Sequence, residues 1–355
     1  MENLKGFYKN KKVFVTGHTG FKGSWLCNIL LYFGASVSGY ALYPQCSDNM
    51  FDICDLKNDI DSYIGDIRDY DRLKKIVSNV NPDIVIHLAA QPLVIESYLN
   101  PKETYEVNVI GTVNILECLR GSNVKSFLNI TTDKVYKNKE WCWGYRENEE
   151  LIGLDPYSNS KSCSELVTYS YKNSFFEDEY SSAISTARAG NVIGGGDFSK
   201  NRIIPDCIKS AISNKTIILR NPNSIRPYQH VLEPLIAYLI LIREQYNDRK
   251  FSGCYNIGPN EEDCVTTGLL ADIFCNNWGK IFEKPVNWIV ETNDGPHEAN
   301  FLKLDCSLFK NTFNWTSKWK IEKALEQTVS WTKSFYEMEN MKEVTFKQIE
   351  EYFKN

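Results

Sequence analysis

The sequence contains no C-x-x-C pair and no cluster of histidines and cysteines at the spacing of a metal site, although 11 of its 355 residues are cysteines. An odd number of cysteines without paired spacing is typical of free thiols in a reducing compartment. We therefore expect a cytoplasmic protein with neither a disulfide framework nor a bound metal.

The sequence also lacks a surplus of positive charge and a long apolar run. Its formal net charge is −5, which predicts no basic face for nucleic acid or anionic lipid. Residues 1–12 are charged and contain no apolar signal core. The most apolar early run, residues 25–43, is broken by Asn28 and Gly34 and is typical of a helix, a turn and a strand. We expect neither a nucleic-acid partner nor a membrane partner.

What the chain does have is a regular alternation of strands and helices over its first 190 residues. Strands alternating with helices of this length predict βαβ units and a parallel sheet. The expected fold class is therefore α/β, with a Rossmann-type, doubly wound parallel sheet. Strands are predicted at 12–16, 36–41, 84–88, 126–131 and 181–188, with a short one ending at 66, and helices at 20–33, 69–79, 101–120 and 156–173.

After residue 190 glycines and prolines become frequent and the alternation is lost. Residues 254–257 still have the pattern of a sheet strand, and residues 321–337 that of an amphipathic helix. We therefore predict a dinucleotide-binding domain at 1–190, to which residues 230–258 return. Residues 191–355 would mainly form a smaller, interleaved substrate-binding domain.

A glycine-spaced loop follows the first strand and opens the first predicted helix. Such glycines allow a tight turn and a close approach of the backbone to a pyrophosphate, which then faces the helix N-terminus. The spacing is G-x-x-G-x-x-G, so a glycine-rich turn of an ordinary βα unit is the alternative. The cofactor contacts predicted in this loop are Gly17, His18, Thr19, Gly20, Phe21, Lys22 and Gly23.

The acidic residue that usually binds the cofactor ribose is missing from the end of the second strand. Residues 39–43 there contain no Asp, no Glu and no arginine for a 2′-phosphate. This pattern favours NAD without excluding NADP. Asp66, at the end of the next strand, is predicted to bond the adenine amino group, and a role in starting the following helix or turn is equally compatible.

Tyr157 and Lys161 stand four residues apart, and therefore on one face of a helix. A lysine ammonium near a phenol lowers the pKa of the phenol, so that the phenolate can accept a hydroxyl proton while hydride leaves the same carbon. Thr132 ends a strand, where its hydroxyl can bond the substrate hydroxyl. The alternative is an exposed aromatic–lysine pair on a surface helix.

These features, with the segments 87–91 and 108–112, resemble the extended short-chain dehydrogenase/reductase family of nucleotide-sugar enzymes. The resemblance runs nearly end to end, and within the family it is to the CDP-glucose 4,6-dehydratases. It implies NAD as cofactor, CDP-glucose as substrate, and a homodimer or a dimer of dimers. The further cofactor contacts that it implies are Asp66, Ile67, Leu88, Ala89, Ala90, Asn108, Thr131, Tyr157 and Lys161.

The segment Thr132-Asp133-Lys134 distinguishes the reactions of this family. Epimerases need only the hydroxyl with the tyrosine and the lysine, whereas dehydratases add an acid and a base, because they also remove the C5 proton and expel the C6 hydroxyl. By this resemblance Tyr157 takes the C4 hydroxyl proton, Asp133 protonates the leaving hydroxyl, and either Lys134 or Tyr157 removes the C5 proton. The dTDP-glucose enzymes carry Asp-Glu instead, so the C5 base stays open. The catalytic set is Thr132, Asp133, Lys134, Tyr157 and Lys161, and a solvated loop pair is the alternative for Asp133 and Lys134.

On the substrate side, Arg226 precedes a helix in a polar run, where a guanidinium can clamp a diphosphate in bidentate fashion. Arg188 is more typical of a structural ion-pair partner, and His87 and His230 of packing residues. The predicted substrate contacts are Gln91, Asn191, Arg202, Arg226, His297 and Glu298, and the aromatic residues that could cover the site are Trp141, Trp143 and Tyr145.

Three other interpretations remain open. The same chemistry could act on a UDP- or dTDP-linked sugar, the chain could be a 4-epimerase, or it could be a catalytically silent dinucleotide-binding module. The helices at 101–120 and 156–173 are expected to pair across a two-fold axis and to bury Leu116, Leu166 and Val167 between two chains.

Overall fold

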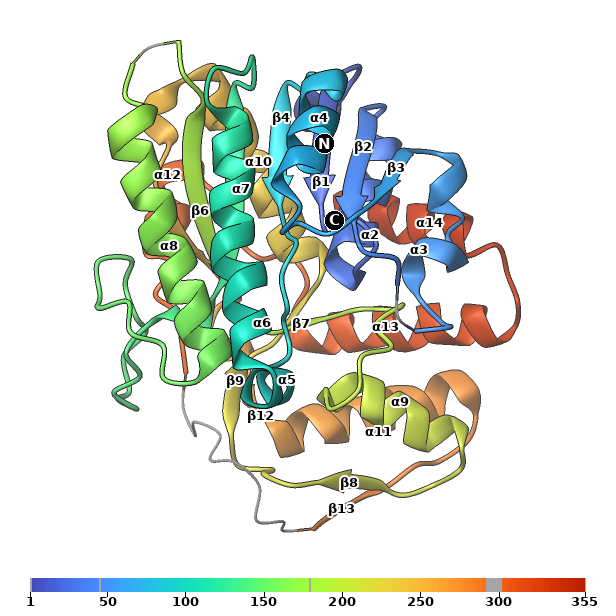
Figure 1. Cartoon of the computed structure of the whole chain (residues 1–355). Helices are drawn as coiled ribbons and strands as arrows, with labels where there is room; N and C mark the ends of the chain where they lie inside the picture. Colours follow the sequence, from blue (N-terminus) through green and yellow to red (C-terminus); the bar gives the residue numbers. More distant parts are fainter. Residues whose placement is uncertain (1, 45, 179, 292–301, 355) are drawn as a thin grey trace.

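The computed structural model describes residues 2–44, 46–178, 180–291 and 302–354. Its centre is a seven-stranded sheet in the order β11-β6-β5-β4-β1-β2-β3, with every neighbouring pair parallel (Figure 1). The strand order reverses between β1 and β4, the point at which open α/β sheets bind ligands. The predicted fold class is confirmed. The strands are β1 Lys12–Thr16, β2 Ser36–Ala41, β3 Asp61–Ile64, β4 Ile84–His87, β5 Ser126–Thr132, β6 Ala183–Ala189 and β11 Cys254–Ile257.

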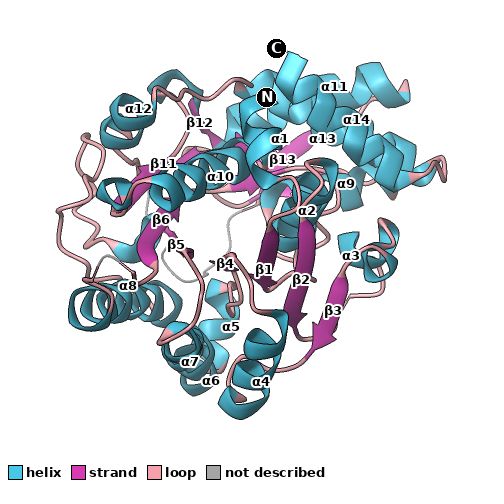
Figure 2. Cartoon of the chain, turned by 90° about the horizontal axis from the view of Figure 1, so that it is seen from above, coloured by secondary structure: helices cyan, strands magenta, loops and turns pink. Residues whose placement is uncertain are grey.

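Helices cover both faces of the sheet (Figure 2). Val13 and Val15 of β1 belong to the core on one face, and Phe14 to the core on the other. Because both faces are buried, the strands are continuous apolar runs. One layer contains α1 Glu2–Tyr8, α2 Phe21–Tyr32, α10 Leu232–Asn247 and α14 Met341–Lys354, and the other contains α4 Tyr70–Val80, α7 Gly111–Leu119 and α8 Pro156–Phe175.

The helix predicted at 101–120 is not continuous. It consists of α6 Pro101–Tyr105, a π-helical turn Glu106–Ile110 and α7, and a separate helix, α5 Val94–Leu99, precedes it. In the π turn the Asn108 amide donates to the backbone oxygen of Gln91 (3.1 Å) and to Ser160 Oγ (2.9 Å). These contacts tie the turn to the segment after β4 and to α8. Such π turns occur frequently at functional sites.

A second unit lies below the carboxyl edge of the sheet in Figure 1, with its own core around Ile204, Phe274 and Trp278. Its last helices run back to the first unit, since α14 packs on α2. β11 lies in the main sheet, as predicted for residues 254–257, while the domain boundaries stay a prediction. The unit contains α9 Ile203–Ile212, β8 Ile217–Leu219, β9 Ile225–Pro227, β12 Cys264–Thr266, α11 Thr267–Phe282, β13 Trp288–Val290 and α13 Ile321–Tyr336.

Short elements complete the described chain. β7 and β10 form a parallel two-stranded pair between the two units. Among the described residues, no helix is long and apolar enough to cross a membrane. These short elements are α3 Met50–Ile53, η1 Leu56–Asn58, η3 Asp133–Val135, β7 Val192–Ile193, β10 Gln229–His230, η4 Arg249–Phe251, η5 Glu261–Asp263 and α12 Ser307–Phe313.

Candidate active site

The glycine loop between β1 and α2 is closely packed at two of its three glycines. Gly17 has a φ of +76°, and a Cβ built on it would lie 2.7 Å from the Ala89 nitrogen. A Cβ on Gly23 would lie 2.1 Å from the Gly17 oxygen, whereas one on Gly20 would approach that oxygen only to 3.4 Å. The loop therefore needs glycine at 17 and 23 to fold, and above Gly20 it leaves room in front of the N-terminus of α2. A pyrophosphate fits a cradle of this kind.

The side chains of His18 and Thr19 hold the loop to the neighbouring strands. His18 Nε2 lies 2.7 Å from Ser62 Oγ, and its ring fills the space above Gly39, where a Cβ would lie 2.3 Å from the ring. Thr19 Oγ1 donates to the Leu42 oxygen at 2.8 Å. Burial lowers the pKa of His18 to about 4, so the ring is neutral at pH 7. Any cofactor contact of these two residues would therefore come from their backbone.

At the adenine end, the Asp66 carboxylate is bonded by Arg68, with Nη2 and Oδ2 2.6 Å apart. Hydrogen bonds from Arg68 lower the pKa of Asp66. Ile67 is buried against Gly111, where a Cβ would lie 2.8 Å from the isoleucine side chain. In this structure Asp66 thus closes a turn, and its contact with adenine stays a prediction. The exposed side chains beside this turn are Leu42, Tyr43 and Ile64.

The segment after β4 is bonded within itself and to the neighbouring helices. His87 Nδ1 lies 2.7 Å from Thr16 Oγ1, and its Nε2 lies 3.3 Å from Thr112 Oγ1, which supports the packing role predicted for His87. The Gln91 amide donates to Thr104 Oγ1 at 2.9 Å, and the Gln91 nitrogen donates to Asn108 Oδ1 at 2.8 Å. Gln91 and Asn108 therefore fix this segment in place. The half-buried residues between them and the glycine loop are Leu88, Ala89 and Ala90.

Tyr157 and Lys161 lie in the first turns of α8, whose N-terminus is capped by Asp155. Lys161 Nζ donates to the Ile130 oxygen at 3.1 Å, and burial lowers the pKa of Lys161 to about 8. Burial also raises the pKa of Tyr157 to about 12, although a hydrogen bond with Thr132 acts in the opposite direction. The lowered phenol pKa predicted from the sequence is therefore wrong for this structure, because desolvation outweighs the neighbouring groups.

Asp133 and Lys134 form η3, directly after β5. Asp133 has no exposed surface, and its Oδ1 accepts bonds from Thr132 Oγ1 (2.9 Å) and Lys134 Nζ (3.0 Å). Its Oδ2 has no partner among the described residues and lies 3.2 Å from a Cβ built on Gly190. The Lys134 side chain is 29% exposed and covers the carboxylate. The predicted acid and base are thus in contact, and the lysine faces the solvent.

Beneath this pair lies a second, fully buried ion pair. Arg188 Nη2 and Glu165 Oε2 are 3.0 Å apart, and Arg188 also donates to the Tyr136 hydroxyl at 2.7 Å. Thr131 donates its hydroxyl to Glu165. Arg188 is therefore the structural partner that the sequence suggested, and Thr131, predicted to contact the cofactor, has its hydroxyl bonded to this pair.

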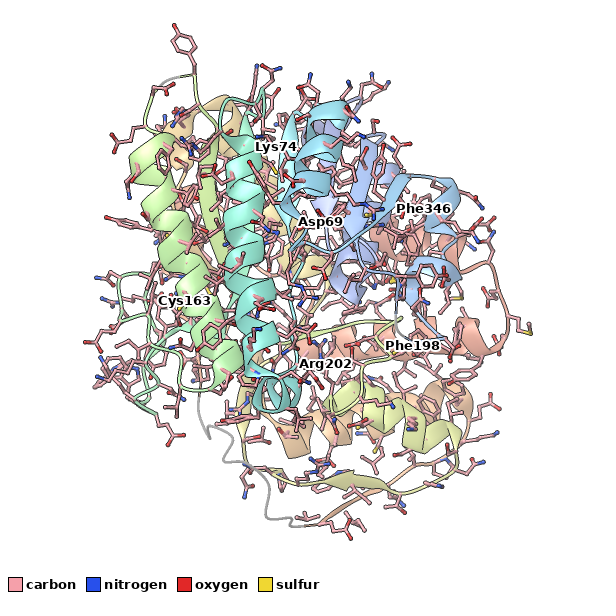
Figure 3. The ribbon with its side chains drawn as sticks, in the orientation of Figure 1. Asp69, Lys74, Cys163, Phe198, Arg202 and Phe346 are labelled. Carbon is pink, nitrogen blue, oxygen red and sulfur yellow. The ribbon has the colours of Figure 1, made fainter. Side chains whose placement is uncertain are left out.

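The predicted substrate contacts come from the second unit and its connections. Arg202 lies where the two units meet, and its Nη1 is 3.2 Å from Asp197 Oδ2 (Figure 3). Arg226 is buried on β9 and donates to the Ile225 oxygen at 3.2 Å. The Asn191 oxygen accepts a bond from the Gln229 nitrogen at 3.1 Å. The predicted contacts His297 and Glu298 lie outside the described residues.

The described residues enclose a cavity of about 570 Å³ that includes none of the predicted catalytic residues. Trp141, Trp143, Lys303 and Asp305 are among the residues that line it. Tyr145 is buried and stacks on Trp141 with ring centroids 5.5 Å apart. Within the described residues, no group of three or more His, Cys, Asp or Glu side chains could hold a metal ion.

The Lys22 side chain has a place in the structure that the sequence pattern did not indicate. It was predicted only as part of the glycine loop, through its backbone. In the structure Lys22 is half-buried, and burial lowers the pKa of its amine to about 8, with a further lowering by Arg202 and an opposite effect of Asp133. A lysine in the first turn of the largely apolar helix α2 was the available signal.

Comparison with known proteins gives one consistent result. The family model described as GDP-mannose 4,6 dehydratase matches residues 14–328. A CDP-glucose 4,6-dehydratase of Salmonella typhimurium is 45% identical over 354 residues, which are 98% of this chain and 98% of the relative. The human dTDP-D-glucose 4,6-dehydratase is 24% identical over 93% of each chain.

Solved structures share the fold. The dTDP-glucose 4,6-dehydratase of Bacillus anthracis, in complex with NAD, superposes with a TM-score of 0.76 at 20% identity and covers 94% of this chain and 99% of that one. The UDP-glucose 4-epimerase of Thermotoga maritima, with UDP-glucose, superposes with a TM-score of 0.77 at 22% identity and covers 91% and 99%.

Proposed function

We propose that this chain, which belongs to the GDP-mannose 4,6 dehydratase family, is an NAD-dependent hydro-lyase that converts CDP-glucose into CDP-4-keto-6-deoxyglucose. The observation that carries the reaction type is the junction of Thr132, Asp133 and Lys134 with Tyr157 and Lys161 at one edge of the sheet. The choice of CDP as the nucleotide is based on the 45% identity with the CDP-glucose 4,6-dehydratase of Salmonella typhimurium.

The residues around the glycine loop fit a dinucleotide. Gly17 and Gly23 leave no space for a side chain, and Gly20 leaves the N-terminus of α2 open. The segment after β2, residues 42–52, contains two aspartates and neither arginine nor lysine, and the Tyr43 hydroxyl donates to the Asp52 carboxylate at 3.2 Å. A 2′-phosphate would meet negative charge there, which favours NAD. When bound, NAD accepts hydride from C4 of the sugar and returns it to C6.

Tyr157 accepts the C4 hydroxyl proton. Thr132 lowers the pKa of this phenol, and because the Thr132 hydroxyl donates its hydrogen to Asp133, its oxygen can accept a bond from the same sugar hydroxyl. With a pKa raised to about 12, the phenol needs added positive charge to ionise near neutral pH. Lys161 and the cationic nicotinamide of the oxidised cofactor would provide that charge, so the base forms only when the site is complete.

Asp133 and Lys134 carry out the elimination. Asp133 is covered by Lys134, so the C6 hydroxyl reaches Asp133 Oδ1 by replacing the Lys134 ammonium there. As it is displaced, the Lys134 ammonium passes a proton to Asp133, which makes Asp133 the acid and leaves Lys134 as a neutral amine near C5, whose proton is acidified by the 4-ketone. Asp133 protonates the leaving hydroxyl, and Lys134 or Tyr157 takes the C5 proton. Each of these proton transfers is worth about 10²–10⁴ in rate.

Arg226 and Arg202 would hold the diphosphate of the nucleotide. Both lie on the second unit, and a guanidinium matches phosphate oxygens in bidentate fashion. Gln91 and Asn191, with His297 and Glu298, would complete the substrate contacts.

We also propose a cytoplasmic homodimer, or a dimer of dimers. All eleven cysteines lie in the described part of the chain and are free thiols there. On α8, the Leu166 side chain is 53% exposed. Apolar side chains close to it in the chain and on the π turn are exposed as well. The predicted contact at Leu116 is wrong, because this side chain is completely buried in the core against the sheet. Ile110, Leu166 and Tyr169 offer the exposed apolar surface instead.

The test is product analysis with NAD and a set of nucleotide-linked glucoses. We expect CDP-glucose to give a product 18 mass units lighter, the mass of water lost, with no net change of cofactor. A preference for UDP-glucose would keep the dehydratase chemistry and discard the nucleotide, and an epimerised sugar of unchanged mass would discard both. Tyr157→Phe is the control variant and should lose about 10²–10⁴ in turnover.

A further inference from the structure

The carboxylate of Asp133 is bonded only by its neighbours in the chain. Its Oδ1 accepts bonds from Thr132 Oγ1 at 2.9 Å and from Lys134 Nζ at 3.0 Å, and its Oδ2 has no partner among the described residues. Within the part of the chain that the structure describes, no hydrogen bond to this carboxylate comes from another element of the fold. The place of the carboxylate in the site therefore depends on how the segment that carries it is held.

Both ends of this segment are bonded to the buried Glu165–Arg188 pair. Before the segment, the Thr131 hydroxyl donates to the Glu165 carboxylate. After it, Arg188 Nη1 donates to the Tyr136 hydroxyl at 2.7 Å. The two members of the pair lie 3.0 Å apart, so a continuous series of polar contacts brackets residues 132–135. Because breaking a buried ion pair is costly, the pair holds both ends of the segment in place.

The Tyr136 hydroxyl joins the segment to two strands of the sheet. Besides accepting a bond from Arg188 on β6, it donates to Asn256 Oδ1 on β11 at 2.7 Å. Arg188 and Asn256 lie opposite each other in the register of these strands. The Tyr136 ring is 2% exposed and stacks on Tyr145 with an angle of 13° between the planes. Tyr136 thus fixes the chain directly after η3.

A second hydroxyl holds the same segment from α8. Ser162 Oγ donates to the Val135 oxygen at 2.7 Å, and it is farther, at 3.1 Å, from the oxygen of Ser158 in its own helix. Val135 is the last residue of η3, and both it and Ser162 are buried. Ser162 therefore ties η3 to the helix that carries Tyr157 and Lys161.

We propose that Tyr136 and Ser162 are positioning residues for Asp133, the acid of the elimination. This inference rests on the proposed dehydratase function. Neither hydroxyl bonds the Asp133 carboxylate, so both act through the backbone of residues 133–136. Loss of either hydroxyl would let this backbone move, and a displacement of a reacting group by about 1 Å can cost about 10² in rate.

C4 oxidation should not depend on these two hydroxyls. It uses Thr132 and Tyr157, and Thr132 is held separately, by its pairing with Ala189 in the sheet. Asp133 enters only afterwards, when the C6 hydroxyl leaves. We therefore expect a loss of rate in the elimination and not in the oxidation.

The test follows the cofactor during one turnover of the full-length protein with NAD and CDP-glucose. The absorbance of NADH rises with C4 oxidation and falls when hydride returns to C6, which can happen only after water has left. In Tyr136→Phe we expect the rise to keep nearly its wild-type rate and the fall to slow by about tenfold to a hundredfold. In Ser162→Ala the fall should slow by about threefold to tenfold. Tyr8→Phe, which removes a buried hydroxyl of α1 that donates to the Leu239 oxygen at 2.8 Å, should change neither rate.

Amide hydrogen exchange of the free protein gives a second measurement that does not depend on activity. The peptide that contains residues 133–136 should exchange faster in Tyr136→Phe and in Ser162→Ala than in the wild type, and at the wild-type rate in Tyr8→Phe. The free energy of unfolding in urea shows whether each variant is folded under these conditions. If Tyr136→Phe does not fold, Ser162→Ala decides the question by the same two measurements.

Three results overturn the proposal. Equal slowing of the rise and the fall would mean that the hydroxyls support the whole site or act through Tyr157 and Lys161. A fall at the wild-type rate in the folded variants would mean that Asp133 keeps its place without them. If the wild type never reduces its cofactor with CDP-glucose or another nucleotide-linked glucose, the proposed function fails and this inference fails with it. A wild-type fall in variants that still make product defeats only this inference.

Discussion

Two pairs of a carboxylate and a cation lie near the carboxyl ends of β5 and β6, and they differ in how completely their hydrogen-bonding positions are filled. In the Glu165–Arg188 pair, each carboxylate oxygen accepts one bond from Arg188 and one from a threonine, Thr131 or Thr186. In the Asp133–Lys134 pair, one oxygen accepts two bonds, and the other has no partner among the described residues.

The difference separates a pair that maintains geometry from a pair that can react. Exchanging a partner of Glu165 would leave a buried charge unpaired, which is costly in a dry interior. Arg188 also bonds Tyr136 and the Glu147 oxygen, so the pair joins β6, α8 and the loop before α8. Asp133 has an unused acceptor and a partly exposed lysine over it, so a substrate hydroxyl can bond this carboxylate without disturbing the core.

The largest effect should come from Asp133→Asn, because it removes the exchangeable proton of the reactive pair and preserves its shape. Turnover should fall by about 10²–10⁴, with little change in stability. Since C4 oxidation precedes the step that needs Asp133, bound NADH should accumulate and be visible by its absorbance. A variant that never reduces its cofactor would assign Asp133 to the first step. Asp248→Asn, in an exposed ion pair, is the control.

Arg188→Met should give the next largest effect, and on stability. Removing one partner of a buried ion pair leaves an uncompensated charge and costs about 3–5 kcal/mol. The free energy of unfolding in urea measures this loss. Arg120→Met, which breaks the exposed pair with Glu117, should cost at most about 1 kcal/mol. Equal losses in the two variants would mean that burial does not distinguish the pairs.

The Glu165–Arg188 pair and the sheet around it could be predicted from the sequence more fully than the surroundings of Asp133 and Lys134. Strands β1, β2 and β4 and helix α8 follow apolar patterns and turn residues, which are local signals. The resemblance to nucleotide-sugar dehydratases is confirmed by the family match, and it places Thr132, Tyr157 and Lys161 on adjacent elements, as the structure does.

The sequence-based predictions that were wrong all depend on contacts between residues far apart in the chain. The π turn at 106–110 depends on what the Asn108 side chain reaches across the fold, and its sequence has no local signal. Leu116 lies on a helix whose apolar residues face two sides, and only packing shows that this side chain points to the sheet. The pKa of Tyr157 moves upward because of desolvation, which spacing along the chain does not reveal.

Lys134 provides the third and smaller test, because the two candidates for the C5 base predict different results. Lys134→Arg keeps the positive charge over Asp133 but gives a group that does not deprotonate. If Lys134 is the base, both Lys134→Arg and Lys134→Met should slow exchange of the C5 proton with deuterated water by about tenfold to a hundredfold. If Tyr157 is the base, Lys134→Arg should exchange at nearly the wild-type rate, and only Lys134→Met should be impaired.

The smallest effect concerns two neutral histidines, His87 and His18, which also differ in how many of their hydrogen-bonding positions are filled. Both ring nitrogens of His87 have hydroxyl partners, whereas His18 uses one, with Ser62. Burial lowers the pKa of His87 to about 3 and that of His18 to about 4. The unfolded chain, with a histidine pKa of about 6.5, therefore binds more protons than the folded chain below pH 6.5.

The stability that depends on a neutral His18 is thus fully present above about pH 6.5 and is lost progressively as the pH falls toward 4. Between pH 6.5 and 5.5 one such histidine contributes at most about 1.4 kcal/mol. His18→Gln keeps a donor toward Ser62 without titrating, so its free energy of unfolding should fall less over this interval than that of the wild type, by about 1 kcal/mol. Contributions from His87 and from the carboxylates are common to both proteins and cancel. Parallel pH curves for the two proteins would mean that His18 takes up its proton in the folded chain without loss of stability. The ring nitrogen of His18 that has no partner would then be able to hold a proton, unlike the two bonded nitrogens of His87.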